Sequence, residues 1–268
     1  MKIAVITGAS SGIGRETARQ MADKGYKVYD LSRTHKPQQG VQHIPCDVTQ
    51  RDTIDAAIQQ IAQTDGRIDV LVLCAGMGVA SSIEFTKEEE MQRQFNVNTY
   101  GPIRVVQAAL PLMRKQPMTN SHERGRIVFV SSMAAVFGIP FQAMYSATKA
   151  AINSFAFSLK NELKAYKLTV SCVQPGDVKT GFGAARCTDL AGSDVYPNMQ
   201  AAIQQMEHDE ENGLTAASCA KRVVKACTKK NPSLYYTSDF LSDLECLGAR
   251  LLPTWLATKV VGMMYHCK

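Results

Sequence analysis

The sequence contains no Cys-x-x-Cys pair, and its eight cysteines are scattered between Cys46 and Cys267. Several of them lie inside apolar, strand-like runs, where a thiol behaves as a small hydrophobic side chain. The five histidines are equally scattered. This distribution argues against a disulfide framework and against a metal site, and it indicates a reducing compartment.

Long hydrophobic runs are also missing. No uncharged apolar stretch reaches the length of about 20 residues with which a helix crosses a bilayer. The first strand is expected at residue 2 or 3, so no signal peptide is expected before it. The chain has 30 lysine and arginine residues and 24 aspartate and glutamate residues, so its net charge is +6. The basic residues form no run, so this charge does not indicate a nucleic-acid partner, although it favours an anionic ligand. We therefore expect a cytoplasmic protein without a membrane span.

The pattern that is present predicts an α/β fold with a parallel sheet. Short apolar runs, typical of buried parallel strands, alternate with segments whose apolar residues repeat at helical spacing. The chain of 268 residues is 45% hydrophobic, which is enough for one large core, and no repeat or linker suggests a second domain. The predicted strands lie at residues 2–6, 26–31, 41–44, 70–73, 126–130, 168–173 and 233–236, and the longest helices at 88–114 and 143–166.

The first strand runs directly into a glycine-rich loop, and a helical pattern follows as far as Gly25. The loop reads Thr7-Gly-Ala-Ser-Ser-Gly-Ile-Gly14. Glycines let a backbone approach a diphosphate closely, and a helix N-terminus offers free N–H groups and a positive dipole. Strand, loop and helix in this order predict a dinucleotide site. Its candidate contacts in the loop are Gly8, Ser10, Ser11, Gly12, Ile13 and Gly14.

The end of the second strand bears on which dinucleotide binds. Folds that take NAD usually place an acid at this point to hold the ribose hydroxyls. This chain has Ser32 and Arg33 there, and Arg15 follows the last glycine of the loop. Guanidinium groups can grip a 2′-phosphate with paired hydrogen bonds, so we expect NADP(H) in preference to NAD(H). The alternatives are that Asp30 holds the ribose in another register, or that both arginines are only solvated.

Two further stretches follow strand ends. Asp47 could accept a hydrogen bond from an adenine amino group or cap the helix that begins near Thr49, and the two roles are compatible. The fourth strand leads into Cys74-Ala75-Gly76. These residues are small, which suits a place where the backbone passes close to a planar group.

Tyr145 and Lys149 are the candidate chemical pair. They are four residues apart in a segment of helical spacing, and such residues share one face of a helix. A neighbouring ammonium favours phenolate, so we expect Lys149 to lower the Tyr145 pKa from about 10. Ser131 and Ser132 end the strand at 126–130, on the side of an open parallel sheet where ligands gather. On the residues alone, either serine is as readily a cap or turn residue as a functional one.

Pro102 lies inside the predicted helix at 88–114. A proline in a helix interior cannot donate to the carbonyl four residues back, which here belongs to Asn98. The sequence therefore predicts a kink, and an Asn98 carbonyl oxygen that is free to hold a water or a side-chain amine. The alternative is a helix that starts late, at Pro102.

These motifs occur in an order and at spacings that are highly specific together, and the chain resembles the short-chain dehydrogenase/reductase family over residues 2–236. The matching positions are Thr7-Gly-x-x-x-Gly12-x-Gly14, Asp47, Cys74-Ala75-Gly76, Asn98, Ser132, Tyr145-x-x-x-Lys149, and Pro175-Gly176 with Thr180. The resemblance implies a Rossmann-type, doubly wound fold with a seven-stranded parallel sheet and helices on both faces. Further nucleotide contacts that it implies are Val48, Ala75, Gly76, Asn98, Tyr145, Lys149, Pro175, Gly176, Val178 and Thr180.

The family's pattern also implies roles for the site residues. Tyr145 would donate a proton to the substrate carbonyl oxygen during reduction, and Ser132 would orient that oxygen by a hydrogen bond. Lys149 would bind the nicotinamide ribose and lower the Tyr145 pKa, and the Asn98 carbonyl would hold a water that links Lys149 to solvent. The hydride comes from the nicotinamide. Cys74 departs from the family's usual Asn-Ala-Gly triplet, which puts the local rigidity of the neighbouring strands in doubt.

We therefore predict an NADP(H)-dependent oxidoreductase that interconverts a ketone and a secondary alcohol. Apolar residues at 137–141, around Phe182 and in the tail suggest a bulky hydrophobic substrate. The run from Ser132 to Lys149 looks most like the branch that acts on hydroxysteroids and retinoids. The alternatives are a 3-oxoacyl thioester reductase and a catalytically silent NADPH-sensing scaffold.

The domain organisation follows from the same interpretation. Residues 1–238 form the dinucleotide-binding and catalytic domain, with a lid at about 181–213, and residues 239–268 are its C-terminal helical extension. The apolar segment 253–265 is expected to cover a cleft, to pack against a second subunit or to touch a membrane surface peripherally, in that order of preference. The helices at 88–114 and 143–166 are expected to form the contact of a homodimer or homotetramer.

Overall fold

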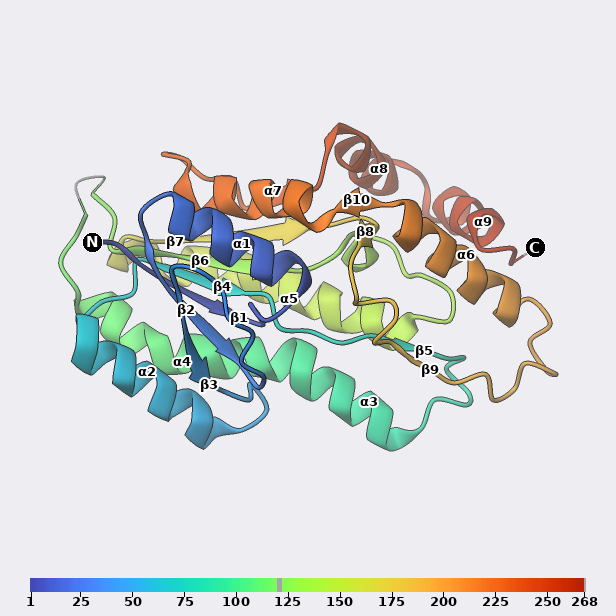
Figure 1. Ribbon diagram of the computed structural model, residues 1–268. Coiled ribbons are helices and arrows are strands. Elements are labelled where there is room, and N and C mark those ends of the chain that lie inside the picture. Colours follow the sequence, from blue (N-terminus) through green and yellow to red (C-terminus); the bar gives the residue numbers. More distant parts are fainter. Residues whose placement is uncertain (120–121, 268) are drawn as a thin grey trace.

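The protein is described by a computed structural model that covers residues 1–119 and 122–267. A sheet of seven parallel strands lies at its centre, in the order β11-β7-β6-β4-β1-β2-β3 (Figure 1). The strands are β1 (Ile3–Thr7), β2 (Lys27–Ser32), β3 (Val41–Pro45), β4 (Val70–Leu73), β6 (Gly125–Val130), β7 (Leu168–Gln174) and β11 (Tyr235–Thr237). The strands β1, β4 and β6 are buried along their whole length, as expected of strands covered on both faces. The predicted Rossmann-type fold is confirmed.

Helices cover both faces of this sheet (Figure 1). They are α1 (Gly12–Asp23) and α7 (Ala216–Thr228) on one face, and α2 (Arg51–Asp65), α4 (Gly101–Lys115) and α5 (Ala143–Glu162) on the other. The first face buries Ile6, Met21 and Val223, and the second buries Phe129 and Ile152. These two cores hold the strands in place, so the loops at their carboxyl ends share one edge of the sheet.

The helix predicted at residues 88–114 is interrupted, which corrects the prediction of a single helix. The helices α3 (Glu88–Phe95) and α4 are joined by a π-helical segment at Asn96–Tyr100, where the Gly101 N–H bonds to the Asn96 carbonyl. Pro102 has no N–H, so the ladder of hydrogen bonds has to change near it. The break expected from Pro102 is therefore present as a wider turn, and Asn98 lies within that turn.

The helix predicted at residues 143–166 is also shorter than expected. It ends at Glu162, and a 3₁₀ turn at Lys164–Tyr166 follows it. Lys167 then adopts a left-handed φ of 56°, which leads the chain out of the turn and into β7.

The segment predicted as a lid, residues 181–213, is anchored by two short parallel ladders. The strand β9 (Cys187–Thr188) pairs with β5 (Val79–Ala80), and β10 (Leu214–Thr215) pairs with β8 (Val178–Lys179). The helix α6 (Met199–Asn212) ends just before β10 and buries Met199, Ala202, Ile203 and Met206. It is amphipathic, because these apolar side chains recur at helical spacing.

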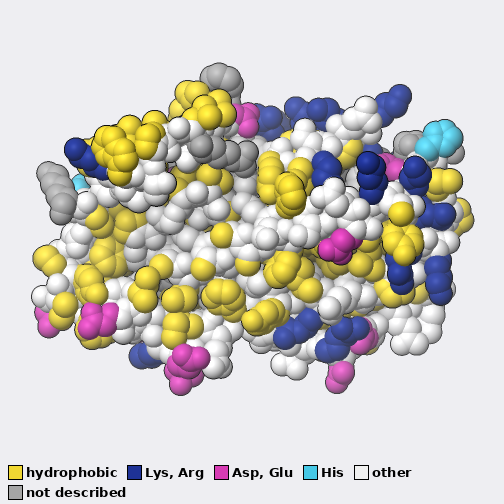
Figure 2. Space-filling view, turned by 180° about the vertical axis from the view of Figure 1, so that it is seen from behind, with side chains coloured by type: hydrophobic (Ala, Val, Ile, Leu, Met, Phe, Trp, Pro, Cys, Tyr) yellow, Lys and Arg dark blue, Asp and Glu magenta, His cyan; other side chains and the backbone are white. Residues whose placement is uncertain are grey.

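The C-terminal tail consists of α8 (Phe240–Leu251) and α9 (Thr254–Met264), separated by Pro253 as predicted. Tyr265, at the end of α9, is buried against Ala202 and Met206 of α6. The outer side of the tail is apolar, and Figure 2 shows hydrophobic side chains gathered there at the upper left. The exposed apolar residues are Leu241, Leu244, Leu247, Leu251, Leu252, Trp255, Val260, Met263 and Met264. Over the part of the chain that is described, no helix combines the length and the apolar character needed to span a bilayer.

Candidate active site

Tyr145 and Lys149 lie one turn apart on α5, beside the carboxyl end of β6. The Lys149 Nζ is 5.5 Å from the centre of the Tyr145 ring and donates a hydrogen bond to the Val130 carbonyl at 3.1 Å. Ser131 donates to the Lys149 carbonyl at 3.1 Å, so the strand end and the helix are joined at two points. Lys149 is buried and Tyr145 is half-buried. The structure thus brings the two predicted residues together at the edge of the sheet where ligands gather.

Ser132 lies against the same pair. Its Oγ accepts from the Ala134 N–H at 3.1 Å and thereby caps the short helix at Met133–Ala135. The Ser132 hydroxyl group is also close enough to the Tyr145 phenol to lower its pKa. The serine is therefore a cap residue and a neighbour of the phenol at once. A substrate oxygen held at this point can meet both hydroxyl groups.

The pKa of Tyr145 moves in the direction opposite to the one expected. Burial of the phenol raises the pKa of Tyr145 to about 12, and the Ser132 hydroxyl group only partly opposes the rise. Burial also lowers the pKa of Lys149, because the ammonium group loses its solvation. The expected net fall of the Tyr145 pKa below about 10 is therefore wrong here, because loss of solvation dominates. The effect of Lys149 on the Tyr145 pKa stays a prediction. The phenol is protonated at neutral pH, as a proton donor must be.

The side chain of Asn98 bridges the loop after β4 to α5. Its Oδ1 accepts from the Met77 N–H at 2.8 Å, and its Nδ2 donates to the Met77 carbonyl at 2.8 Å and to Thr148 Oγ1 at 3.3 Å. A Cβ added at Gly76 would lie 3.4 Å from Asn98 Oδ1 and 3.7 Å from Lys149 Nζ. Asn98, Gly76 and Lys149 therefore meet at one point. The water expected on the Asn98 main-chain carbonyl stays a prediction.

Thr7 provides the link at the end of β4 that Cys74 was expected to lack. Its Oγ1 accepts from the N–H groups of Cys74 and Ala75, at 3.0 Å and 3.1 Å. A Cβ added at Gly8 would come within 2.9 Å of the Ala75 Cα, so the glycine-rich loop and this junction are in close contact. Burial raises the pKa of Cys74 to about 11, and the thiol is neutral. A hydroxyl group from β1 thus holds the junction whose rigidity was in doubt.

The glycine-rich loop has the shape of a diphosphate cradle. Gly8 and Gly12 have left-handed φ angles of 71° and 53°, and a Cβ added at Gly14 would overlap the Gly8 carbonyl oxygen. The side chain of Ser11 makes no capping hydrogen bond to α1, which leaves N–H groups at the helix N-terminus available to an anion. The loop therefore fits the phosphates of a dinucleotide. Two more residues of the predicted set are half-buried here, Ser10 and Ile13.

The chain after β7 forms the opposite wall of this cradle. A Cβ added at Gly12 would lie 3.5 Å from Thr180 Cγ2, so Thr180 faces the loop. The Gly176 N–H donates to Ser238 Oγ at 3.1 Å, and the Pro175 carbonyl accepts from the Met133 N–H at 2.8 Å. Val178, in β8, is half-buried. The structure therefore places Thr180 against the loop, whereas the recorded contacts of Pro175 and Gly176 are with Met133 and Ser238.

At the adenosine end, Asp30 is engaged inside the fold. Its Oδ1 accepts from the Ala9 N–H at 3.0 Å, and its Oδ2 accepts from Ser32 Oγ at 2.8 Å. Both Asp30 and Ser32 are buried, whereas Arg33 is exposed at the strand end. Asp30 thus supports the glycine-rich loop from within the sheet, and Arg33 is the group that faces solvent there.

Asp47 and Val48 lie at the carboxyl end of β3. Asp47 Oδ1 accepts from both the N–H and the Oγ1 of Thr49 at 2.8 Å, which closes a turn before α2 rather than capping that helix directly. Val48 is buried, and a Cβ added at Gly101 would lie 2.9 Å from its Cγ2. The two residues therefore join the adenosine end to the start of α4.

The family model described as short chain dehydrogenase matches residues 2–190 of this chain. The chain belongs to the short-chain dehydrogenase family. It is 36% identical over 235 residues to a 3-ketodihydrosphingosine reductase of Bacteroides thetaiotaomicron, with 86% of this chain and 85% of the relative covered. It is 32% identical over 181 residues to the 3-oxoacyl-[acyl-carrier-protein] reductase MabA of Mycobacterium tuberculosis, with 68% and 71% covered. The structure of a short-chain dehydrogenase from Streptomyces avermitilis is similar at a TM-score of 0.80 and 25% identity, over 99% of this chain and 96% of that one.

Family membership makes this short-chain dehydrogenase an NAD(P)-dependent oxidoreductase, as the motifs predicted. The comparisons do not single out the hydroxysteroid and retinoid branch.

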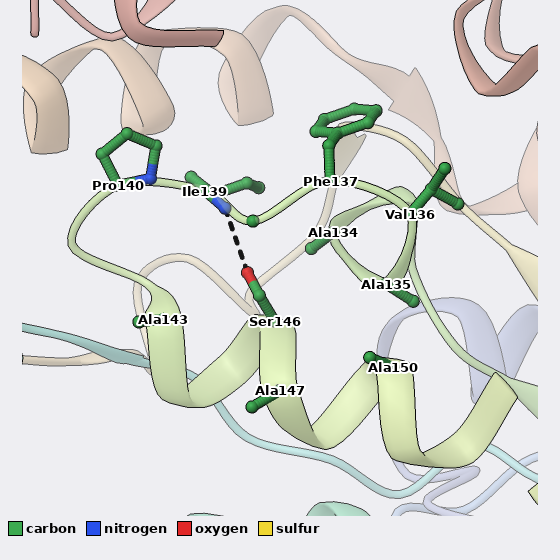
Figure 3. A pocket seen from close by; sticks show the side chains of 11 residues that line it. Ala134, Ala135, Val136, Phe137, Ile139, Pro140, Ala143, Ser146, Ala147 and Ala150 are labelled. Carbon is green, nitrogen blue, oxygen red and sulfur yellow. Dashed lines mark hydrogen bonds between the residues drawn. The ribbon is translucent and has the colours of Figure 1, made fainter. Parts of the chain in front are cut away.

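A groove of about 560 Å³ lies beside α5 in this short-chain dehydrogenase (Figure 3). It runs between residues 134–140 and the α5 side chains Ala143, Ala147 and Ala150. Successive helical residues are turned by about 100°, so Ala147 and Ala150 point away from the side of α5 that carries Tyr145 and Lys149. The groove therefore lies on another side of α5 from Tyr145 and Lys149.

A charged pair within residues 181–213, the segment predicted as a lid, escaped the sequence-based analysis. Arg186 forms an ion pair with Glu210 of α6, and the Arg186 side chain has 0% exposure. Phe182, from the same segment, packs against Tyr145 with ring centres 5.8 Å apart. A Cβ added at Gly78 would lie 3.2 Å from the Phe182 ring and 3.3 Å from Arg186 Cγ, so the pair lies next to the site. No spacing signal reveals it, because its members are 24 residues apart on an irregular path.

Proposed function

We propose that this protein is an NADP(H)-dependent reductase of a ketone carried by a bulky hydrophobic molecule. The observation that carries the proposal is the cluster of Tyr145, Ser132 and Lys149 at the carboxyl end of β6. It offers a phenol that is protonated at neutral pH, lies beside a second hydroxyl group and is backed by a buried amine. Such a group is arranged to donate a proton to a carbonyl oxygen.

Each residue of the cluster has a distinct role in reduction. The substrate carbonyl oxygen accepts hydrogen bonds from Tyr145 and Ser132, which polarise it. When bound, the dinucleotide supplies a hydride to the carbonyl carbon. Tyr145 transfers its phenolic proton to the oxygen on which negative charge develops, and the alcohol results. Burial destabilises the Tyr145 phenolate that remains after the transfer. Lys149 and Ser132 offset this cost, because they lie beside the phenolate and little water screens the Lys149 charge.

Two features support NADP(H) in preference to NAD(H). The carboxylate in the second strand, that of Asp30, is buried and accepts from Ala9 and Ser32. Arg33 is exposed at the same strand end, and Arg15 reaches the following loop, where its Nη2 donates to the Pro37 carbonyl at 3.4 Å. Guanidinium groups at this place suit a 2′-phosphate better than free ribose hydroxyls.

The relatives support a lipid-like substrate. The names 3-ketodihydrosphingosine reductase and 3-oxoacyl-[acyl-carrier-protein] reductase both describe a ketone near the head of an aliphatic chain. We therefore rank a long-chain ketone first, with the 3-oxoacyl thioester as second candidate. The hydroxysteroid or retinoid substrate stays a prediction and enters the assay as a comparison.

The test is consumption of NADPH, followed by its absorbance, with a long-chain keto amine, a 3-oxoacyl thioester, a ketosteroid and retinal. Tyr145→Phe removes only the phenolic hydroxyl group. We expect it to lower turnover by about 100-fold or more while NADPH affinity, measured by fluorescence titration, stays close to that of the unaltered protein. Tyr166→Phe, at an exposed tyrosine beyond α5, is the matched control and should retain turnover.

Two outcomes would contradict the proposal. Substantial turnover by Tyr145→Phe would show that another group transfers the proton. Tight NADPH binding without reduction of any ketone in the panel would support the catalytically silent NADPH-sensing scaffold instead.

A further inference from the structure

The chain between β8 and α6 buries a charged pair whose hydrogen-bonding capacity is only partly used. Arg186 donates to Glu210 Oε1 through Nη2. The Arg186 side chain is fully buried, yet its Nε and Nη1 have no hydrogen-bond partner among residues 1–119 and 122–267. Glu210 Oε2 is buried and unpartnered in the same way. Buried polar groups are nearly always hydrogen-bonded, so three such atoms in one place point to a ligand group that satisfies them.

This pair lies beside the reacting group. The ring of Phe182 packs on Tyr145, and both Phe182 and Arg186 lie against Gly78. The charges of Glu210 and Arg186 are close enough to Tyr145 to act on its pKa, Glu210 raising it and Arg186 lowering it. The pair therefore lies on the Phe182 side of the phenol, next to the place where a substrate carbonyl oxygen would meet Tyr145.

A second carboxyl group lies on the same side. Asp177 is exposed in the turn between β7 and β8, and its charge also acts on the Tyr145 pKa. Loss of solvation, with Asp209 and Glu245 adding to it and Arg186 opposing, raises the pKa of Asp177 to about 6. Two carboxyl groups thus accompany one guanidinium, and a cation that enters here improves the balance of charge.

Small residues leave room for this arrangement. A Cβ added at Gly183 would overlap Glu210 Oε2, and a Cβ added at Gly78 would crowd Arg186 Cγ at 3.3 Å. Glu210 Oε2, one of the unsatisfied atoms, therefore lies against Gly183, and the Arg186 side chain packs against Gly78.

We propose that Arg186, Glu210 and Asp177 bind a polar head group next to the ketone, one that combines a protonated amine with a hydroxyl group. The hydroxyl oxygen accepts from Arg186 Nε and Nη1, and the ammonium donates to Glu210 Oε2 and to the Asp177 carboxylate. This inference rests on the proposed ketone reduction and names its substrate class as long-chain amino ketones. A long-chain ketone with a hydroxyl group but no amine can bond only to Arg186, and it leaves the carboxylates of Glu210 and Asp177 without a cation.

The experiment compares two substrates with the full-length protein and NADPH. One is 3-ketodihydrosphingosine, which carries an amine and a hydroxyl group beside its ketone, and the other is the same hydroxy ketone without the amine. We expect kcat/KM to favour the amino ketone by about tenfold or more, the effect of a hydrogen bond to a charged group. Glu210→Gln keeps the bond to Arg186 but loses its charge, so most of this preference should disappear. Glu211→Gln, at the exposed neighbouring residue, is the matched control and should keep the preference.

The outcomes separate this inference from the proposed function. Equal kcat/KM for the two ketones, or a preference that survives in both Glu210→Gln and Asp177→Asn, overturns the head-group site while ketone reduction stands. No turnover of either ketone or of any other ketone in the panel removes both proposals. Circular dichroism and NADPH titration check whether Glu210→Gln is folded. If Glu210→Gln does not fold, the kcat/KM values of the two ketones are compared in Asp177→Asn, which changes an exposed residue.

Discussion

Thr7 connects the glycine-rich loop to the end of β4, and its replacement by valine isolates the contribution of one hydroxyl group. The Oγ1 accepts from the N–H groups of Cys74 and Ala75 at 3.0 Å and 3.1 Å, and Thr7 is buried. Valine has almost the same shape as threonine, so no cavity forms, but it offers no acceptor. Thr7→Val therefore leaves two N–H groups without their partner.

The expected loss follows from the burial of those two groups. A buried donor left unsatisfied costs about 1–3 kcal/mol. Cys74 and Ala75 are half-buried, so we take the lower part of that range for each and expect the free energy of unfolding to fall by about 2–3 kcal/mol. Thr7→Ser is the matched control, because it keeps the acceptor and loses one methyl group, at about 1 kcal/mol. NADPH should also bind more weakly to Thr7→Val, since Gly8 and Ala75 are in close contact.

Urea unfolding, followed by circular dichroism, measures the free energy difference, and fluorescence titration measures the affinity for NADPH. A Thr7→Val variant as stable as Thr7→Ser would show that the hydroxyl group does not hold the junction. A loss of stability with unaltered NADPH affinity would show that the junction does not shape the cofactor site.

Three further predictions test other parts of the structure. Arg33→Glu is expected to weaken NADPH binding by about tenfold or more and to spare NADH, and an equal loss for both would contradict the role given to Arg33. The pKa of Asp177, at about 6, lies above the usual value of about 3.9, so its stabilising contribution is complete below about pH 4 and is lost as the pH rises through about 6. Asp177→Asn should therefore raise stability at neutral pH by about 1 kcal/mol after allowance for solvent screening, whereas exposed Asp194→Asn should not. Phe157 is 58% exposed on α5, one of the helices predicted to join subunits, so Phe157→Asp should give monomers in sedimentation, and an unchanged oligomer would place the contact elsewhere.

The parts of the site that depend on local chemistry could be predicted from the sequence. Tyr145 and Lys149 lie on one side of α5 because residues four apart in a helix always do. Gly8 and Gly12 adopt the left-handed φ angles that a close backbone approach needs, and other residues rarely do so. The strands of the sheet were equally visible, and β1, β4 and β6 are the ones buried along their whole length, as expected of strands covered on both faces.

Where the form of an element depends on packing, the prediction was incomplete. Pro102 indicated a break in the helix, but a kink, a late start and a π-helical segment all follow from a missing N–H. The structure has the π-helical segment at Asn96–Tyr100, and the side chain of Asn98 then bonds to Met77 and Thr148. Likewise, Cys74 indicated a weakened junction, and the compensating Thr7 hydroxyl comes from a neighbouring strand.

The sequence by itself determined the fold, the family, the glycine-rich loop and the pairing of Tyr145 with Lys149, because each depends on spacing along the chain. Only the tertiary structure decided the state of that pair, since the pKa of Tyr145 depends on burial and burial depends on what packs around the phenol. It alone also placed Arg186 and Glu210 beside the site with atoms left unsatisfied. Electrostatic interactions act through space between segments that are distant in sequence, so no pattern along the chain records them.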